Sequence, residues 1–289
     1  MDQVKFGIIG IGRWAREVHI KNLNNVPQAK VVALSSRSRD SLDGGLEATK
    51  DSPRTYTDYH KLLEDPQVDA VVIAVPNHMH QQIAVEALQA GKHVFCEKPV
   101  AISMSQYEQI REALAQTDRV FQVGFELRHA NLYSTVKKKI ESGLIGRPGI
   151  VWCNLYRGAV RSQWRLDESV SGGLLLELCL HHFDLLSWFS DAEPVRVSGT
   201  KRQTEDNSGY DAASIDIEFS NGVVGSLVLS LFTEFEQDID MGIVADAGIL
   251  KSSHKADSLT LTSREHPDGK SIPVPTVEPK EYGFCGSRR

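Results

Sequence analysis

Apolar residues in the first half of the chain form short continuous runs that alternate with longer segments of helical spacing. Runs such as residues 4–10 and 69–75 are typical of strands buried on both faces of a parallel sheet. The repeated order of strand and helix predicts a doubly wound parallel sheet with right-handed crossovers. Further strands are expected at 30–36, 93–96 and 119–125, and helices at 13–25, 38–50, 58–66, 79–90 and 103–116.

The pattern changes after an expected helix at 129–142. Apolar and polar residues then alternate in segments joined by short turns, which is typical of an antiparallel sheet, and a leucine-rich helix at 172–189 interrupts them. We therefore expect an α/β chain with a doubly wound domain at 1–125 and an α+β domain, with a largely antiparallel sheet, at 126–289. The expected strands of the second domain are 149–158, 194–203, 212–220, 222–232 and 238–253.

Charge and cysteine content exclude several classes of function. The chain of 289 residues has a net charge of −6, so we expect binding neither to nucleic acid nor to an anionic membrane. The four cysteines show no paired spacing, which predicts reduced thiols rather than a disulfide framework or a zinc motif. The sequence shows no signal peptide and no apolar run long enough to span a membrane, so we expect a cytoplasmic protein.

A glycine-rich turn, "GIGRWA" at 10–15, follows the first strand and opens the first helix. It matches the G-x-G-x-x-A pattern of the dinucleotide-binding Rossmann fold, in which Gly10 makes the tight turn and Gly12 lets the backbone approach a pyrophosphate. The phosphates would bind the N–H groups at the start of the helix, beside Arg13 and Trp14. A turn whose glycines are purely structural is the alternative.

The residues after the second expected strand indicate which dinucleotide binds. Sites that prefer NAD usually have a carboxylate there for the ribose 2′-hydroxyl, whereas this chain has Ser36 and Arg37. Hydroxyl and guanidinium groups suit a 2′-phosphate, so we expect NADP in preference to NAD. The alternative is that Arg37 stacks on the adenine of either cofactor.

The loop after the strand at 93–96 carries candidate catalytic groups. Ligands of open α/β sheets bind outside the carboxyl ends of the strands, so Glu97 and Lys98 are expected to face a cleft. Pro99 keeps Lys98 out of helical geometry. A lysine held in such a place can donate a proton or a hydrogen bond, although a solvated turn is the commoner context for a Lys-Pro pair.

The helix at 172–188 is apolar on most of its surface but has one polar face. The residues on that face are Glu177, His181, Asp184 and Trp188. A histidine paired with a carboxylate and directed at a cleft is a candidate general acid or base. A purely structural buried histidine is one alternative, and metal binding by Glu177 and His181 is another; no complete set of metal ligands is present, so we expect no metal.

These motifs together resemble the Gfo/Idh/MocA oxidoreductases, the family of glucose-fructose oxidoreductase and the inositol dehydrogenases. The resemblance runs from residue 4 to about residue 250 and rests on "GIIGIGRWA", on the E-K-P signature at 97–99 after "AGKHV", and on the 172–188 stretch. That stretch is similar to the family pattern G-G-x-L-x-D-x-G-x-H-x-x-D. The resemblance implies that Lys98 and His181 form the catalytic pair and contact the substrate, with Glu177 at the position of the family aspartate.

The resemblance also implies further contacts. Arg128, in "FELRH", matches a position near the substrate, and the Lys98–Pro99 peptide bond is expected to be cis. Asn77 and His80 match positions on the nicotinamide side. The cofactor contacts implied by motif position are Pro76, Asn77, His80, Glu97 and Lys98, in addition to those of the glycine turn and the second strand.

Three features depart from the family pattern. Glu177 is one methylene longer than the aspartate, and Cys179 fills the place of a glycine. The chain ends "VEPKEYGFCGSRR" without a periodic apolar stripe. We expect either that the closing C-terminal helix of the family is absent or that the chain is a truncated or frame-altered product, and in both cases apolar surface would be left uncovered.

The sequence therefore predicts an NAD(P)-dependent oxidoreductase that transfers hydride between nicotinamide and a hydroxyl or carbonyl carbon of a sugar, a polyol or a related small polar substrate. In the oxidation direction His181 would act as general base, Lys98 would stabilise the alkoxide, and Glu177 would orient His181 or a neighbouring hydroxyl. A hydrolase or isomerase with transient redox chemistry, and a non-catalytic dinucleotide sensor or co-repressor, are the alternatives. A homo-oligomer formed through the C-terminal sheet is expected.

Overall fold

The structure, a computed structural model, describes residues 3–275 apart from 161, 203–210, 234–237 and 254–257. Contacts divide the chain into two compact units. The first unit contains the residues up to Gly124 together with Asp167–Gly172, and the second contains Phe125–Leu166 and the described residues from Gly173 onward.

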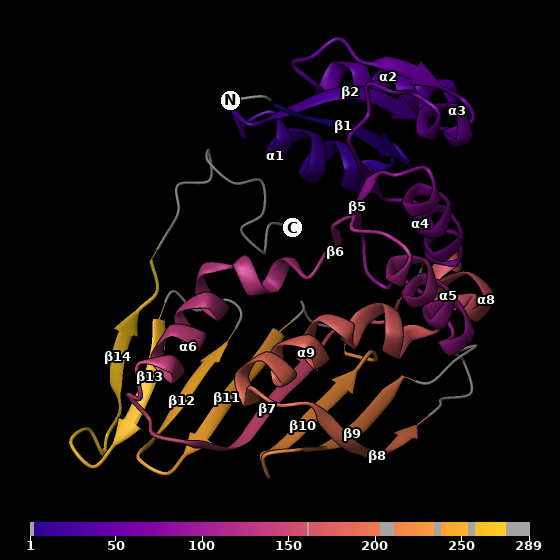
Figure 1. Cartoon of the computed structure of the whole chain (residues 1–289). Coiled ribbons are helices and arrows are strands. Elements are labelled where there is room, and N and C mark those ends of the chain that lie inside the picture. The colour runs from indigo at the N-terminus through magenta and orange to yellow at the C-terminus, as the bar shows by residue number, and fades with distance from the viewer. Residues whose placement is uncertain (1–2, 161, 203–210, 234–237, 254–257, 276–289) are drawn as a thin grey trace. The chain divides into compact units, whose positions relative to one another are not determined.

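The first unit is built on a six-stranded sheet with the order β3-β2-β1-β4-β5-β6 (Figure 1). All of its strand pairs are parallel, which confirms the predicted doubly wound sheet. β3 was not predicted, because three residues are too few to show a periodic pattern. The strands are β1 (Val4–Ile9), β2 (Ala29–Ser35), β3 (Arg54–Tyr56), β4 (Ala70–Ile73), β5 (His93–Cys96) and β6 (Phe121–Val123).

Helices connect these strands at the predicted places. Side chains of Ser38, Asp58 and Ser103 cap three of them by accepting backbone N–H groups. The first helix differs from a regular α-helix, because its middle is a π-helix. The helical segments between the strands are η1 (Ala15–Ile20), α1 (Lys21–Leu23), α2 (Arg39–Ala48), α3 (Tyr59–Leu63), η2 (Asn77–Met79), α4 (His80–Gln89) and α5 (Met104–Ala115), and the unit also contains α8 (Glu168–Ser171), which was not predicted.

The second unit contains an eight-stranded sheet with the order β14-β13-β12-β11-β7-β10-β9-β8. Only the β7–β10 pair is parallel among the pairs described, which confirms a largely antiparallel sheet. The expected strand at 238–253 is two strands, because the chain turns between Ala245 and Gly248. The strands are β7 (Pro148–Tyr156), β8 (Pro194–Arg202), β9 (Ala212–Phe219), β10 (Val224–Ser230), β11 (Asp238–Ala245), β12 (Gly248–Ser253), β13 (Ser258–Ser263) and β14 (Lys270–Pro273).

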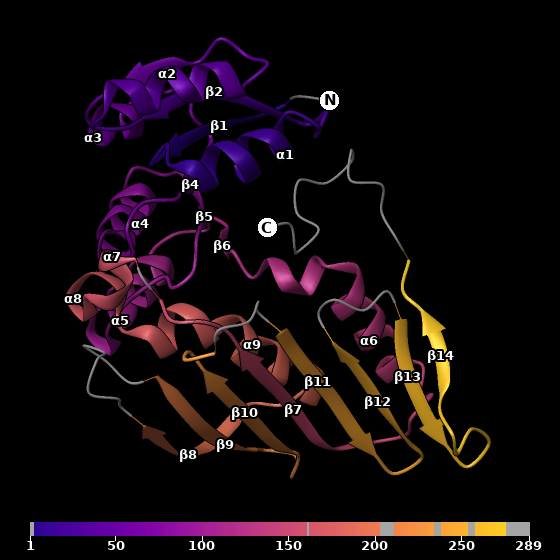
Figure 2. The ribbon, with the colours of Figure 1, turned by 180° about the vertical axis from the view of Figure 1, so that it is seen from behind.

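One face of this sheet is covered by helices α6 (Asn131–Glu141) and α9 (Leu174–Ser190), which both views show on the same side of the strands (Figures 1 and 2). Leucines and Phe189 of α9 pack there against the inward residues of β7, β9 and β10. α9 begins two residues later than predicted, because Gly172 and Gly173 both have positive φ and break the chain from α8. The short helices η3 (Glu126–His129) and α7 (Gln163–Leu166) also belong to the unit. The end of the chain, where the sequence predicts no closing helix, lies outside the described residues.

Candidate active site

A cavity of about 520 Å³ opens in the first unit at the carboxyl ends of β1, β2, β3 and β4. This volume lies within the range of about 300–1,000 Å³ found for small-molecule pockets. Ligands of doubly wound sheets bind at this edge, so the cavity lies where the sequence predicted the dinucleotide. The lining residues that follow β1 and β4 are Gly10, Ile11, Gly12, Ala74, Val75 and Pro76.

Two glycines in this cavity differ in what their missing side chains would meet. Gly10 has φ of +91°, and a Cβ built there would lie 2.4 Å from the Ala74 carbonyl oxygen. A Cβ at Gly12 would meet no heavy atom within 4 Å. Gly10 is therefore needed for the turn itself, whereas the space beside Gly12 fits the pyrophosphate of a dinucleotide.

This difference predicts that alanine at Gly10 lowers stability, whereas alanine at Gly12 weakens nucleotide binding. Gly10→Ala is expected to lower the free energy of unfolding by about 1–3 kcal/mol, because alanine is strained at this φ and clashes with the backbone. Gly12→Ala is expected to leave stability unchanged and to weaken NADH binding about tenfold, or 1.4 kcal/mol, because its methyl group occupies the ligand's space. Thermal denaturation and NADH fluorescence titration measure the two effects. Unchanged NADH binding by Gly12→Ala would contradict the assignment.

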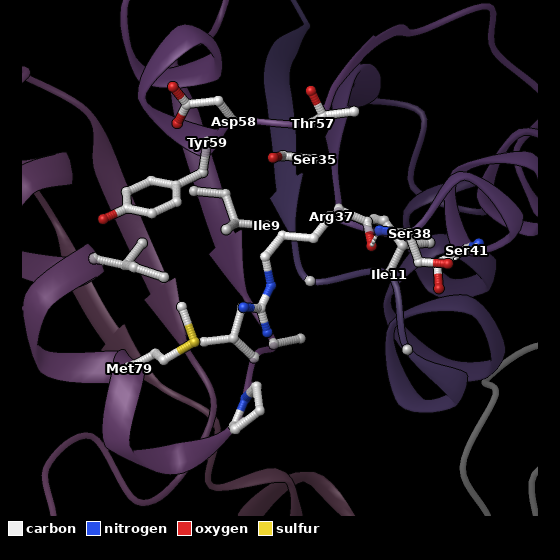
Figure 3. A pocket seen from close by; sticks show the side chains of 17 residues that line it. Ile9, Ile11, Ser35, Arg37, Ser38, Ser41, Thr57, Asp58, Tyr59 and Met79 are labelled. Carbon is white, nitrogen blue, oxygen red and sulfur yellow. Dashed lines mark hydrogen bonds between the residues drawn. The ribbon is translucent and has the colours of Figure 1, made fainter.

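The part of the cavity beyond β2 is polar. Figure 3 shows the Arg37 side chain extending across the cavity towards Met79, with Ser38 and Ser41 on the other side of its backbone. Asp58 also lines the cavity, and its carboxylate accepts the backbone N–H of His60 at 3.0 Å and contacts the His60 ring Nδ1 at 2.6 Å. These contacts hold the pKa of Asp58 below its ordinary value.

The residues after β4 have two different environments. Pro76 lines the cavity, whereas Asn77 and His80 are 4% and 1% exposed. The Asn77 side chain donates to the Ser171 carbonyl oxygen at 2.9 Å, and the two ring nitrogens of His80 lie 2.7 and 2.8 Å from the carbonyl oxygens of Pro99 and Val75. These contacts indicate that Asn77 and His80 hold the loops around the cavity. Their direct contact with nicotinamide stays a prediction.

The loop after β5 carries Glu97 and Lys98, and the Lys98–Pro99 peptide bond is cis, as the family resemblance implied. Glu97 is largely buried; its carboxylate Oε1 accepts the indole N–H of Trp14 at 2.7 Å and lies 2.8 Å from Nε2 of His19. Burial opposes ionisation of Glu97, but the contacts with His19 and Trp14 outweigh it and hold its pKa below the ordinary value. Arg13, by contrast, is exposed and pairs with Glu17 at 2.9 Å.

In the second unit, the polar face of α9 is paired with other segments. The Glu177 side chain is 4% exposed and lies 3.3 Å from Nε of Arg165 on α7. Nε2 of His181 lies 3.2 Å from the Glu126 carboxylate on η3, and the His181 ring meets Phe125 edge-on. The structure therefore contains the expected histidine–carboxylate pair, in which the carboxylate next to His181 belongs to Glu126.

Arg128 and Asp184 form a second pair on this face. The Arg128 guanidinium donates from Nε and Nη2 to the two carboxylate oxygens of Asp184 and lies 5.6 Å from the centre of the Trp188 ring. The two-point bond raises the pKa of Arg128 against the opposing effect of burial. Because both donors are already bonded, contact of Arg128 with substrate would use its remaining N–H groups, and that contact stays a prediction.

Sequence reasoning missed Glu126, Arg165 and Asp58. The first two are ordinary polar residues on short helices, and only the folded chain reveals their partners on α9. Asp58 follows β3, the strand that was not predicted. Among the described residues, no three His, Cys, Asp or Glu side chains are grouped as metal ligands, and no helix in that part of the chain could cross a membrane.

Comparison with known families gives two matches. The model of the oxidoreductase family with an NAD-binding Rossmann fold matches residues 4–125, and that of the GFO/IDH/MocA C-terminal domain matches residues 133–251. These two regions correspond to the parallel sheet and to most of the larger sheet.

Individual proteins also resemble the chain in sequence and in fold. It is 30% identical to scyllo-inositol 2-dehydrogenase (NAD(+)) of Bacillus subtilis, over 85% of this chain and 72% of the relative. It is 31% identical to inositol 2-dehydrogenase/D-chiro-inositol 3-dehydrogenase of Lactiplantibacillus plantarum, over 86% and 71%. Levoglucosan dehydrogenase in complex with NADH shares the fold, with a TM-score of 0.85 and 22% identity over 98% of this chain and 83% of that one. The motifs, the two sheets and these relatives show that the chain belongs to the Gfo/Idh/MocA family of oxidoreductases.

Proposed function

We propose that this oxidoreductase is a dehydrogenase that oxidises a secondary hydroxyl of a cyclic polyol or sugar. The observation that carries the proposal is the pair formed by His181 of α9 and Glu126 of η3. An imidazole beside a carboxylate is held in one orientation and is stabilised when it gains a proton. The names of the curated relatives, which are inositol dehydrogenases, support a cyclic polyol as the substrate class.

The residues of the chain have separate roles in this reaction. Nicotinamide, when bound, supplies the carbon that accepts the hydride. His181 accepts the proton of the substrate hydroxyl, and Glu126 orients its ring. Lys98 donates a hydrogen bond to the oxygen on which negative charge develops. Glu177 contacts a neighbouring hydroxyl, and its pairing with Arg165 fixes the carboxylate for that purpose.

We further propose that residues 1–125 bind the dinucleotide and that residues 126–289 bind the substrate and form a homo-oligomer. Ile150 and Val224 support the oligomer, because these cross-strand neighbours are 46% and 44% exposed on a sheet whose other face is covered by helices. Light scattering of the purified chain tests it, and a monomer at micromolar concentration would contradict it.

NADP is proposed as the preferred cofactor, with NAD as the alternative. Ser36 and Arg37 line the cavity directly after β2, where they can contact a 2′-phosphate. Arg37→Gln is expected to raise the Kd for NADPH about tenfold, equivalent to 1.4 kcal/mol, and the Kd for NADH less than threefold. Fluorescence titration with both nucleotides measures this. An equal loss for both would instead favour stacking of Arg37 on adenine.

The dehydrogenase assignment itself is tested by two measurements on the purified full chain. NADH and NADPH are first titrated by nicotinamide fluorescence, and a panel of inositols and sugars is then offered with NAD and NADP. Reduction of the cofactor by one of the polyols supports the proposal. Product formation without net cofactor reduction, or nucleotide binding without any turnover across the panel, counts against it.

A further inference from the structure

The first helix of the parallel-sheet unit changes its winding directly after the glycine turn. Residues 13–14 and Lys21–Leu23 are α-helical, whereas Ala15–Ile20 is a π-helix. In an α-helix each residue turns by about 100°, so residues 14 and 19 would lie about 140° apart around the axis. In a π-helix the backbone hydrogen bonds run from i to i+5 and each residue turns by a smaller angle, so Trp14 and His19 lie closer to the same side of the axis.

This winding brings two nitrogen donors to one carboxylate oxygen. The Trp14 indole N–H and the His19 Nε2 both contact Oε1 of Glu97, at 2.7 and 2.8 Å. The side chains of His19 and Glu97 are only 11% and 12% exposed, and the His19 ring packs edge-on against Phe95 of β5. Charge-assisted hydrogen bonds of this kind fix the direction of a carboxylate and are stronger where water is excluded.

Gly124 lies close to the Glu97 carboxylate as well. A Cβ built on Gly124 would lie 3.1 Å from Oε2 and 3.2 Å from the carboxylate carbon of Glu97. The absence of a side chain at Gly124 therefore leaves room for the carboxylate in its present position. Trp14 and His19 come from the first helix and Gly124 follows β6, and all three lie against the same group.

We propose that Trp14 and His19 are positioning residues, which fix the Glu97 carboxylate and so set the position of its chain neighbour Lys98, the lysine used in the reaction. The inference rests on the proposed function, because it takes Lys98 as the hydrogen-bond donor to the reacting oxygen. Lys98 follows Glu97 in the chain and attracts its carboxylate electrostatically, so a fixed carboxylate gives the ammonium group a partner charge in a fixed place. A π-helical turn at this place is consistent with such a role, because these turns often occur at functional sites.

The experiment compares wild type with Trp14→Phe and His19→Phe, which remove one donor each and keep an aromatic ring. His19→Gln, which retains an N–H donor, is the rescue variant, and Lys21→Ala, an exposed residue of the same helix, is the matched control. Gly124→Ala disturbs Glu97 without changing either donor. Each variant is first checked for an unchanged melting temperature.

Three quantities are measured: kcat across pH, the Kd for NADH, and the rate at which Lys98 is acetylated by an amine-directed reagent, followed by peptide mass spectrometry. We expect both phenylalanine variants to lower kcat about tenfold, to change its pH dependence, and to leave the Kd for NADH within threefold. We expect Lys98 to be acetylated at least threefold faster in both variants, because its ammonium is held less firmly. His19→Gln and Lys21→Ala are expected to resemble wild type, and Gly124→Ala to resemble the phenylalanine variants.

Two outcomes would overturn the inference. One is a wild-type value of kcat and of Lys98 acetylation in both phenylalanine variants. The other is a tenfold rise in the Kd for NADH with kcat unchanged, which would assign Glu97 to cofactor binding alone. Acetylation requires no turnover, so the role of Trp14 and His19 is decided even if wild type oxidises no polyol, a result that would refute only the proposed function.

Discussion

Replacing Lys98 with alanine is expected to lower kcat by about 10²–10³, the effect of removing one donor that stabilises an oxyanion. The Kd for NADH is expected to change less than threefold, because the turn at Gly10 and Gly12 that receives the dinucleotide is unaltered. Steady-state kinetics with the best substrate of the panel and fluorescence titration provide the two values.

The control for this substitution is Lys61→Ala, which removes an exposed lysine of the same unit that pairs with Glu64 on the surface. Its kcat should equal that of wild type. A Lys98→Ala enzyme that retains turnover within about tenfold of wild type would show that the lysine is not the donor, whatever the position of Glu97.

Replacing His181 with asparagine is the second substitution that is expected to have a large effect. It should lower kcat by about 10²–10⁴, as removal of a general base does. The pH dependence of kcat should lose the limb that belongs to the histidine, because asparagine does not accept the proton. Glu126→Gln should lower kcat only about tenfold, because the amide still orients the ring but no longer stabilises the imidazolium. Stopped-flow and steady-state measurements across pH separate the two variants.

His129→Asn is the matched control, since His129 ends the same short helix η3 as Glu126 and is exposed. It should leave both kcat and its pH dependence unchanged. If His181→Asn keeps more than a tenth of the wild-type kcat with the same pH dependence, another group accepts the proton.

Most of the fold could be predicted because its elements are regular. The parallel strands are nearly continuous apolar runs, and the helices between them begin at serine or aspartate caps that are visible in the sequence. β13 was missed although its apolar and polar residues alternate, whereas the other errors fall where local signals are weak. β3 and β14 have three and four residues, and the turn between β11 and β12 carries no proline and only one glycine, so the two strands were taken as one.

The candidate site was predictable where its residues belong to a local motif. Gly10, Gly12 and the loop at 97–99 lie next to strand ends, and both lie at the edge of the sheet that the motifs implied. Pairings between distant segments could not be read in the same way. Trp14 is 83 residues from Glu97 and Arg128 is 56 residues from Asp184, so their contacts depend on packing that no short stretch encodes. The π-helix is a further example, because "AREVHI" has no feature that distinguishes it from an ordinary helix.

The position of β7 in the larger sheet determines when that sheet can form during synthesis. β7 ends at Tyr156, but its two neighbours, β10 and β11, are Val224–Ser230 and Asp238–Ala245. The ribosome must therefore add about 90 more residues before β7 is paired on both sides, and pairing over such separations is slow. During that interval the leucine-rich α9 has already been made and lacks the strands that bury it. The nascent chain thus exposes its most apolar helix until β9 and β10 emerge, and this is the stage at which chaperone binding would prevent aggregation.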